Sequence, residues 1–360
     1  MSKILFVGDI HTKDWIIDKV DELLNTDKEI DKAVFTGDYL DEFGATYNDN
    51  INILNKVINF KNKNKDKVTL LIGNHELSYL GFPCSGHIYN ENINDLLKQN
   101  LDLFDLIYEE DNFIVSHGGL TKNWIELLIN EYNQNSVDDI IKLLNIKFHD
   151  KCESLFNYLS MASFTSGSNS SIASLLWSRP KDHLYNSIKY KTQIVGHTPT
   201  NESIHPIKYV NESSSIYYID TFSLYRNMTP IGTQEVLIYD RDRNEYYGVE
   251  LKMNNQDIIK ETKQFLDKIE IVYDNNDTDI CITEDQHNLL NKLLESYSKE
   301  KSKIDVVKTI IQNLINSLEA QGYWEFLETK DLDKCIDILK GLQYSINNIE
   351  KESNHERKEK

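Results

Sequence analysis

Short apolar runs, separated by longer segments with helical spacing, constrain the fold of this chain more than any other feature. Residues 15–24 and 51–58 are two of these longer segments, and their apolar side chains recur every three or four positions. The short runs are typical of buried strands. They are residues 4–7, 33–35, 68–72, 113–115, 193–195, 216–219 and 236–239. Alternating strands and helices predict a layered α/β fold for roughly the first 240 residues.

Polar clusters follow five of these runs at the point where each strand should end. Because ligands of an open α/β sheet gather beyond the carboxyl ends of its strands, we expect the five clusters to meet in one crevice. The clusters are Gly8-Asp9-Ile10-His11, Gly37-Asp38-Tyr39-Leu40-Asp41, Gly73-Asn74-His75-Glu76, Ser116-His117-Gly118-Gly119 and Gly196-His197-Thr198.

The residue types in these clusters suit a pair of divalent metal ions. Two such ions can hold a phosphate ester while a shared hydroxide attacks the phosphorus in line with the leaving oxygen. Asp9 and His11 are two positions apart, so in an extended chain both side chains point the same way and can bind one ion. Asp38 has two carboxylate oxygens and can bridge the ions. The remaining predicted ligands, for the second ion, are Asn74, His117 and His197.

Nitrogen and oxygen ligands without a thiolate favour transition metals over magnesium or calcium alone. Manganese is the first choice for both ions, with iron, zinc or nickel as alternatives.

These motifs resemble the calcineurin-like metallophosphoesterase superfamily. They are most similar to its phosphoprotein phosphatase branch, which includes bacterial and phage enzymes, and to the related symmetrical diadenosine tetraphosphatases. Beyond the ligands, the resemblance is carried by the segments I-V-S-H-G-G-L (114–120), L-L-W-S-R-P (175–180), V-G-H-T-P (195–199) and Y-I-D-T (218–221). It covers residues 3–240 and implies a layered β-sandwich flanked by helices.

The resemblance also implies roles for residues near the metals. His75 would protonate the leaving oxygen, and Asp41 would orient His75, since a carboxylate beside an imidazole holds its proton in place. Asn74 would contact the substrate as well as a metal.

Two positions depart from the family pattern. Glu42 stands where the family has a phosphate-binding arginine, and its carboxylate should repel the substrate. Phe222 replaces a glycine and is expected to narrow or reshape the mouth of the site. Arg179 is the predicted substitute for the missing arginine, although the same residue could be a plain surface arginine.

The spacing of apolar residues divides the chain into a main domain and an appendage. We predict a metallophosphoesterase domain over 1–250, with a helical cap inserted at 121–175. Residues 251–346 predict a helical appendage, and 347–360 form a charged tail too polar to pack. The appendage could bind a protein partner or a second copy of the chain.

The functional prediction is a phosphatase that hydrolyses phosphate monoesters, with serine/threonine-type protein phosphatase as the leading interpretation and phosphotyrosine in proteins left open. The alternative is a nucleotide or dinucleoside polyphosphate hydrolase. A shallow groove in the cap would suit a phosphorylated protein, whereas a deep pocket would suit a nucleotide. A different class is a catalytically silent scaffold that binds a partner through the appendage, but the complete ligand set argues against it.

Net charge, cysteine spacing and hydropathy argue against several other classes of protein. The formal charge of −19 argues against non-specific nucleic-acid binding. Four widely spaced cysteines indicate reduced thiols rather than a disulfide framework. No apolar stretch approaches the roughly 20 residues that a membrane helix needs, and no signal peptide is evident, so we expect a cytoplasmic protein with no membrane contact.

Overall fold

A computed structural model describes most of the first 252 residues. The described residues are 2–42, 45–82, 90–110, 112–186, 188, 190–201, 207–208, 215–225 and 230–252. One compact unit comprises residues 1–223 and 231–251. The predicted appendage and tail lie outside the described residues, apart from Leu251 and Lys252.

The first sheet has six strands, with the order β11-β10-β1-β2-β3-β4. The strands are β1 (Lys3–Val7), β2 (Ile30–Phe35), β3 (Val68–Leu71), β4 (Phe104–Asp105), β10 (Glu235–Asp240) and β11 (Glu245–Glu250). Strands β1 to β4 are parallel, so the chain segments that follow β1, β2 and β3 all emerge at one edge of the sheet.

The second sheet has five strands among the described residues, with the order β5-β6-β7-β9-β8. They are β5 (Ile107–Glu109), β6 (Phe113–Ser116), β7 (Thr192–Pro199), β8 (Ile207–Lys208) and β9 (Ser215–Asp220). Because β6, β7 and β9 are parallel, their carboxyl ends also share an edge.

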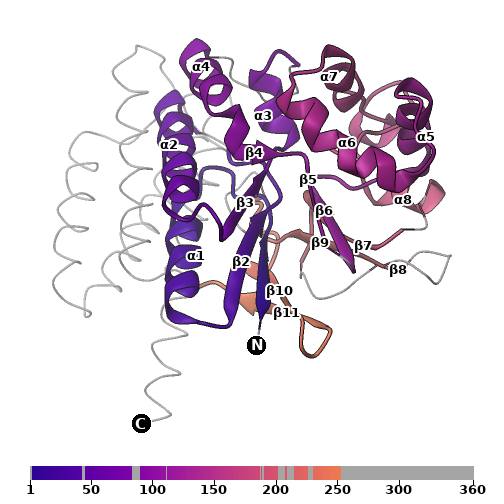
Figure 1. The fold of residues 1–360 in the computed structure, drawn as a ribbon. Helices are drawn as coiled ribbons and strands as arrows, with labels where there is room; N and C mark the ends of the chain where they lie inside the picture. Colours follow the sequence, from indigo (N-terminus) through magenta and orange to yellow (C-terminus); the bar gives the residue numbers. More distant parts are fainter. Residues whose placement is uncertain are drawn as a thin grey trace, which may run out of the picture. The chain divides into compact units, whose positions relative to one another are not determined.

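The core lies between the two sheets. Ile4 and Phe6 of β1 alternate with residues that face the other way, and both pack against Phe113 and Ile194 of the second sheet. Figure 1 shows α1 and α2 beside the first sheet and α5 to α8 beside the second. The predicted β-sandwich flanked by helices is therefore confirmed.

The helices account for most of the remaining described chain. They are α1 (Asp14–Thr26), α2 (Tyr47–Lys63), α3 (Asn74–Tyr79), α4 (Glu91–Gln99), α5 (Lys122–Glu131), α6 (Val137–His149), α7 (Glu153–Leu159) and α8 (Pro180–Tyr185), with 3₁₀ turns η1 (Leu101–Leu103) and η2 (Phe164–Ser166). Helices α5, α6 and α7 lie within the predicted cap. No helix in the described part of the chain has the length and apolar character needed to cross a membrane.

Candidate metal centre

Four of the predicted site residues have a left-handed backbone, which non-glycine residues rarely adopt. The φ angles are 38° at His11, 52° at Asp38, 62° at Asp41 and 62° at His197. Such conformations cost about 1–3 kcal/mol each and cluster at functional sites. At His197 the strand pairing of β7 with β9 is irregular between Val195 and Pro199, so a local bulge re-aims this side chain.

Two glycines let the strand ends approach the carboxylates closely. A methyl group at Gly196 would come within 2.1 Å of Asp9 Oδ1, and one at Gly73 within 2.1 Å of Asp38 Oδ1. Any larger residue at either position would displace a predicted ligand.

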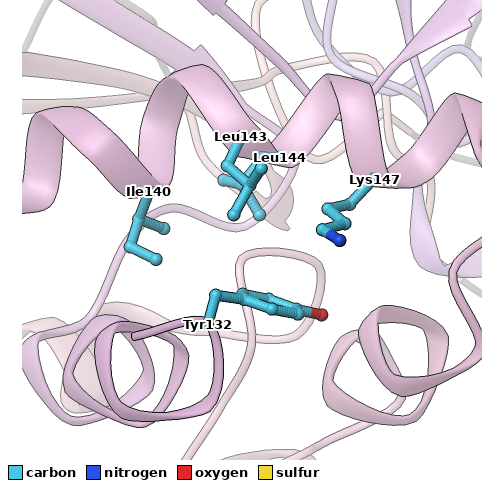
Figure 2. A pocket seen from close by; sticks show the side chains of 5 residues that line it. All are labelled: Tyr132, Ile140, Leu143, Leu144 and Lys147. Atoms are coloured by element: carbon cyan, nitrogen blue, oxygen red, sulfur yellow. The ribbon is translucent and has the colours of Figure 1, made fainter. Parts of the chain in front are cut away.

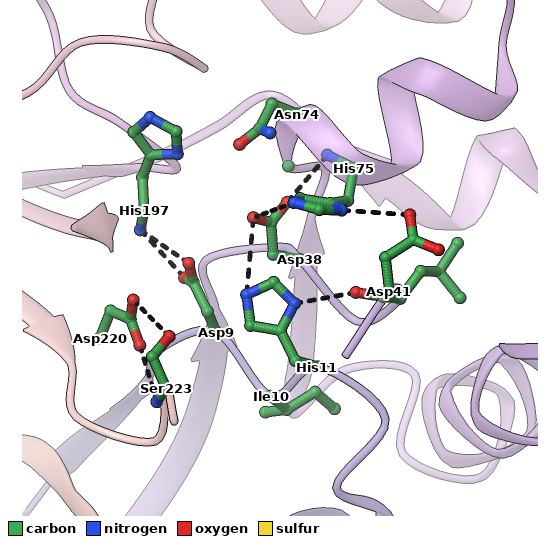
Figure 3. Close-up of polar contacts among 12 residues, drawn as sticks. Asp9, Ile10, His11, Asp38, Asp41, Asn74, His75, His197, Asp220 and Ser223 are labelled. Carbon is green, nitrogen blue, oxygen red and sulfur yellow. Dashed lines mark hydrogen bonds and ion pairs between the residues drawn. The ribbon is translucent and has the colours of Figure 1, made fainter. Parts of the chain in front are cut away.

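Asp38 lies at the centre of the site, as Figure 3 shows. Its Oδ2 atom is 3.3 Å from His117 Nε2, and 4.0 Å from the Nε2 atoms of both His11 and His75. Each of these imidazoles uses its other nitrogen elsewhere. His117 Nδ1 donates to the Thr36 carbonyl at 2.9 Å, and His11 Nδ1 donates to the Leu40 carbonyl at 2.8 Å.

Because Nδ1 of His117 and of His11 is already hydrogen-bonded to a carbonyl, the Nε2 atom of each ring faces oxygen acceptors. His117 Nε2 is also 2.9 Å from Asn74 Oδ1. A nitrogen lone pair that faces two acceptor oxygens is repelled, so a proton or a metal ion belongs between these atoms. A ring N–H bound to a carbonyl or carboxylate is the usual arrangement behind a metal-binding histidine.

Two groups of side chains could each hold an ion. Within the described residues they are His11–Asp38–His75 and Asp38–His117–His197, and in each group the ligand atoms lie within 4.8 Å of one another. His197 Nε2 is buried and has no hydrogen-bond partner among the described residues. An ion beside Asp38 would satisfy this atom, so the residues present fit the predicted metals.

Asp9 lies beside these groups rather than within them. Its carboxylate accepts hydrogen bonds from the His197 backbone N–H at 2.9 and 3.1 Å and from Thr36 Oγ1 at 3.3 Å. Asp9 and His11 do not lie in an extended segment, because β1 ends at Val7 and the backbone is left-handed at His11, so their binding of one ion stays a prediction. Asp220, for which the sequence suggested no role, is a second buried carboxylate near Asp9 and is held by Ser223 (Figure 3).

Buried charges shift the pKa values at the site. Burial alone would lower the pKa of His117, but the charges of Asp38 and Asp9 raise it to about 9. Burial would raise the pKa of Asp38, but His117 and His75 hold it well below its usual range. Burial, together with the charges of His117 and Arg179, holds the pKa of His197 well below its ordinary value. Asp38 therefore remains ionised and His197 remains neutral, as metal ligands must be.

The structure brings His75 and Asp41 together, as the sequence predicted. His75 Nδ1 donates to Asp41 Oδ2 at 3.1 Å. Burial would lower the pKa of His75, but the charges of Asp38 and Asp41 raise it to about 9. His75 thus keeps a proton at neutral pH, although its distance from Asp38 also suits a metal ligand.

Glu76 is a site residue that sequence reasoning quoted within a motif without giving it a role. It is fully buried, and its two oxygens accept hydrogen bonds from four backbone N–H groups. The donors are Asp38 and Gly73 at 2.9 Å, Tyr39 at 2.8 Å and Leu40 at 3.3 Å. This carboxylate holds the loop that carries Asp38 in its left-handed conformation.

The structure corrects both expectations about the departures from the family pattern. Glu42 forms an ion pair with Lys13, and both side chains are largely buried. Its charge is therefore compensated and does not simply repel a substrate. Phe222 is fully buried and packs edge-on against Trp15, so it does not narrow the mouth of the site.

Arg179 lies next to a predicted ligand. Its Nη1 donates to the His197 carbonyl at 3.1 Å, and its side chain is only partly buried. Its backbone N–H donates to Asp182 at the start of α8, which fixes the segment.

A small hollow lies in the cap, away from this site. Figure 2 shows it between Tyr132 and helix α6, where Ile140, Leu143, Leu144 and Lys147 complete its lining. None of the predicted site residues contributes to it.

Comparisons with known proteins give one family match. The model of the calcineurin-like phosphoesterases matches residues 2–201. No curated protein sequence matches the chain.

Among solved structures, the chain is similar to a cold-active protein-tyrosine phosphatase of a psychrophilic Shewanella species. The identity is 16% over 69% of this chain and 81% of that one, with a TM-score of 0.44. It is also similar to a protein serine/threonine phosphatase of Saccharomyces cerevisiae. The identity is 13% over 70% of this chain and 81% of that one, with a TM-score of 0.37. A third similar structure is a metallophosphoesterase from Sphaerobacter thermophilus. The identity is 12% over 76% of this chain and 94% of that one, with a TM-score of 0.33.

Proposed function

This chain belongs to the calcineurin-like phosphoesterase family, and we propose that it hydrolyses phosphate monoesters on proteins phosphorylated at serine or threonine. The observation that carries the proposal is the position of Asp38 Oδ2, which three imidazole Nε2 atoms surround at 3.3 to 4.0 Å. This arrangement supports Asp38 as the ligand common to two ions.

We assign the metal ligands as the sequence suggested. Asp9, His11 and Asp38 would hold one ion, and Asp38, Asn74, His117 and His197 would hold the other. When bound, two divalent ions supply Lewis-acid charge and lower the pKa of a water molecule. Manganese is our first choice of metal because every ligand atom is nitrogen or oxygen.

The residues of the chain then position and protonate the substrate. A water oxygen forms a bond to phosphorus on the side opposite the leaving oxygen. As the bond from phosphorus to that oxygen breaks, His75 Nε2 gives it a proton, and the attacking water loses a proton to solvent. Solvent then reprotonates the neutral His75, and Asp41 stabilises the imidazolium before the proton is given and after it is regained. In the metal-free protein the charges of Asp38 and Asp41 raise the pKa of His75 to about 9, so the ring carries the proton that this role requires.

Arg179 is the proposed phosphate contact. The cation at position 13 is already paired with Glu42, whereas the Arg179 guanidinium lies near His197 and is partly exposed. A guanidinium can donate two parallel hydrogen bonds to phosphoryl oxygens that face away from the metals. Asn74 could contact the same group.

Two further features belong to the proposal. The net charge of −19 makes a protein or nucleotide substrate more plausible than non-specific nucleic-acid binding. We also propose a cytoplasmic location, which the wide spacing of the four cysteines in the sequence supports.

Relative rates on four substrates test the substrate class. The protein is purified with Mn²⁺ and assayed on p-nitrophenyl phosphate, its bis-ester, a phosphoserine peptide and diadenosine tetraphosphate. We expect kcat/KM to be highest for the phosphopeptide and negligible for the bis-ester. A higher value for diadenosine tetraphosphate would identify a nucleotide hydrolase instead, and no turnover of any ester would favour a silent scaffold. Asp38→Asn protein purified in the same way controls for contaminating phosphatases.

A further inference from the structure

Asp41 is held in place by more than His75. Its Oδ1 atom accepts hydrogen bonds from Tyr79 Oη at 2.7 Å and from Asn50 Nδ2 at 3.0 Å. Asn50 Oδ1 in turn accepts from the Asp41 backbone N–H at 2.9 Å, and Asn50 Nδ2 also lies 3.2 Å from Tyr79 Oη. The three side chains form a closed set of hydrogen bonds behind the His75–Asp41 pair.

Both supporting residues come from rigid, buried elements. Asn50 and Tyr79 are fully buried. Tyr79 is four residues after His75 in α3, so the two side chains lie on the same face of that helix. Asn50 lies in the first turn of α2, whose start is fixed by the capping box of Thr46 and Asp49.

These contacts decide how the Asp41 carboxylate is oriented. Two donors on Oδ1 leave Oδ2 for His75 Nδ1, and the carboxylate cannot rotate without breaking both of them. The same donors reduce the cost of placing a buried negative charge beside the imidazole. The hydrogen bond to Nδ1 also fixes which ring nitrogen faces the reaction.

We propose that Asn50 and Tyr79 are positioning residues that fix the Asp41 carboxylate and thereby hold His75 in place to deliver its proton. The inference rests on the proposed function, in which His75 protonates the leaving oxygen. Tyr79 and Asn50 belong to neither of the two candidate ligand groups, and we infer that they act through Asp41.

Leaving-group dependence distinguishes this role from a purely structural one. Phenyl phosphate needs protonation of its leaving oxygen far more than p-nitrophenyl phosphate does. Tyr79→Phe should therefore lower kcat on phenyl phosphate about 10-fold, and on p-nitrophenyl phosphate less than about 2-fold, with KM unchanged. Asn50→Ala should give the same pattern.

Tyr239 offers a matched control. Its hydroxyl donates to Asn244 Oδ1 at 2.8 Å and accepts from Asn112 Nδ2 at 3.1 Å, so like Tyr79 it donates to a side-chain oxygen and accepts from an asparagine amide. It is buried in β10 opposite Ile4, away from the carboxyl end of β1. Tyr239→Phe should leave the ratio of the two rates as in the wild type.

A double-mutant cycle with His75→Asn completes the test. If Tyr79 acts through His75, Tyr79→Phe should cause no further loss on phenyl phosphate in the His75→Asn protein. Equal losses on both esters, or an undiminished loss in the His75→Asn background, would overturn the positioning role while leaving the phosphatase proposal intact.

A spectroscopic readout does not depend on turnover. The hydrogen-bonded Nδ1 proton of His75 is identified in the proton NMR spectrum by its absence from His75→Asn. We expect this signal to move in Tyr79→Phe and to stay in place in Tyr239→Phe. An unchanged signal in Tyr79→Phe would refute the inference even if the wild type hydrolysed no phosphate ester, a result that would itself refute the proposed function.

Discussion

Replacing Glu76 by glutamine should release the loop that carries Asp38. The carboxylate accepts four backbone N–H bonds, two on each oxygen. A glutamine keeps one oxygen and turns an NH₂ group toward the other two N–H donors. Two hydrogen bonds are therefore lost and replaced by a repulsive contact.

The size of the effect follows from the charge and burial of Glu76. A hydrogen bond to a charged group contributes about 1.5–3 kcal/mol, so the loss of two predicts a destabilisation of about 3–6 kcal/mol. Burial and the charge of Asp38 raise the pKa of Glu76 to about 7. Because a carboxyl with a raised pKa destabilises the folded state when it ionises, the loss at pH 8 should lie at the low end of this range, about 3 kcal/mol.

Thermal unfolding and metal content measure this prediction together. A loss of about 3 kcal/mol should lower Tm by roughly 6–12 °C in a unit of this size. We also expect less than a full complement of Mn²⁺, because Asp38 loses its fixed backbone.

The control is Asp240→Asn, which makes the same change from carboxylate to amide. Asp240 is a buried carboxylate at the end of β10, which lies at the opposite end of the sheet from the site. Asp240 Oδ1 accepts from the backbone N–H groups of Asp242 and Arg243, and an amide oxygen can keep both bonds. This variant should retain its metal. If Glu76→Gln protein matched it in metal content and in Tm to within about 2 °C, the loop-holding role of Glu76 would be refuted.

Two further predictions concern the substrate and the metals. Arg179→Ala should cost about 1.5–3 kcal/mol of transition-state binding, mostly as a higher KM and weaker inhibition by phosphate, whereas the exposed Arg243→Ala should change neither. A value of kcat/KM within about 2-fold of wild type would exclude Arg179 as the phosphate contact. In metal-free protein the pKa of His117 is raised to about 9, so its proton must leave before a metal binds. Apparent Mn²⁺ affinity should therefore rise about tenfold per pH unit between pH 6.5 and 9, and calorimetry that finds a flat profile would contradict the assignment of His117.

The sequence predicted the strands and the meeting of the polar clusters for one physical reason. Short apolar runs bounded by turn residues are typical of buried strands, and parallel strands bring their carboxyl ends to one edge. All seven runs are strands in the structure, from β1 to β10. The short or exposed strands β4, β5, β8 and β11 were not predicted, because so few residues carry little periodic signal.

Contacts between distant residues could not be predicted from local patterns. The ion pair of Lys13 with Glu42 and the burial of Phe222 against Trp15 depend on how separate loops pack. The left-handed backbone at His11 is likewise set by tertiary contacts rather than by its own sequence preference.

Glu76 illustrates the same limit most clearly. Its position after Gly73-Asn74-His75 was visible in the sequence. Its four backbone hydrogen-bond donors could not be predicted, because three of them come from residues 38 to 40, far from Glu76 in the sequence.

Metal content of Asp38→Asn protein tests the central claim most directly. Wild-type protein loaded with Mn²⁺ should carry two ions per chain by elemental analysis, and Asp240→Asn should match it. Asp38→Asn should retain at most one ion and show no phosphatase activity, because the shared oxygen loses its charge. Two retained ions together with undiminished turnover would contradict a site built around Asp38.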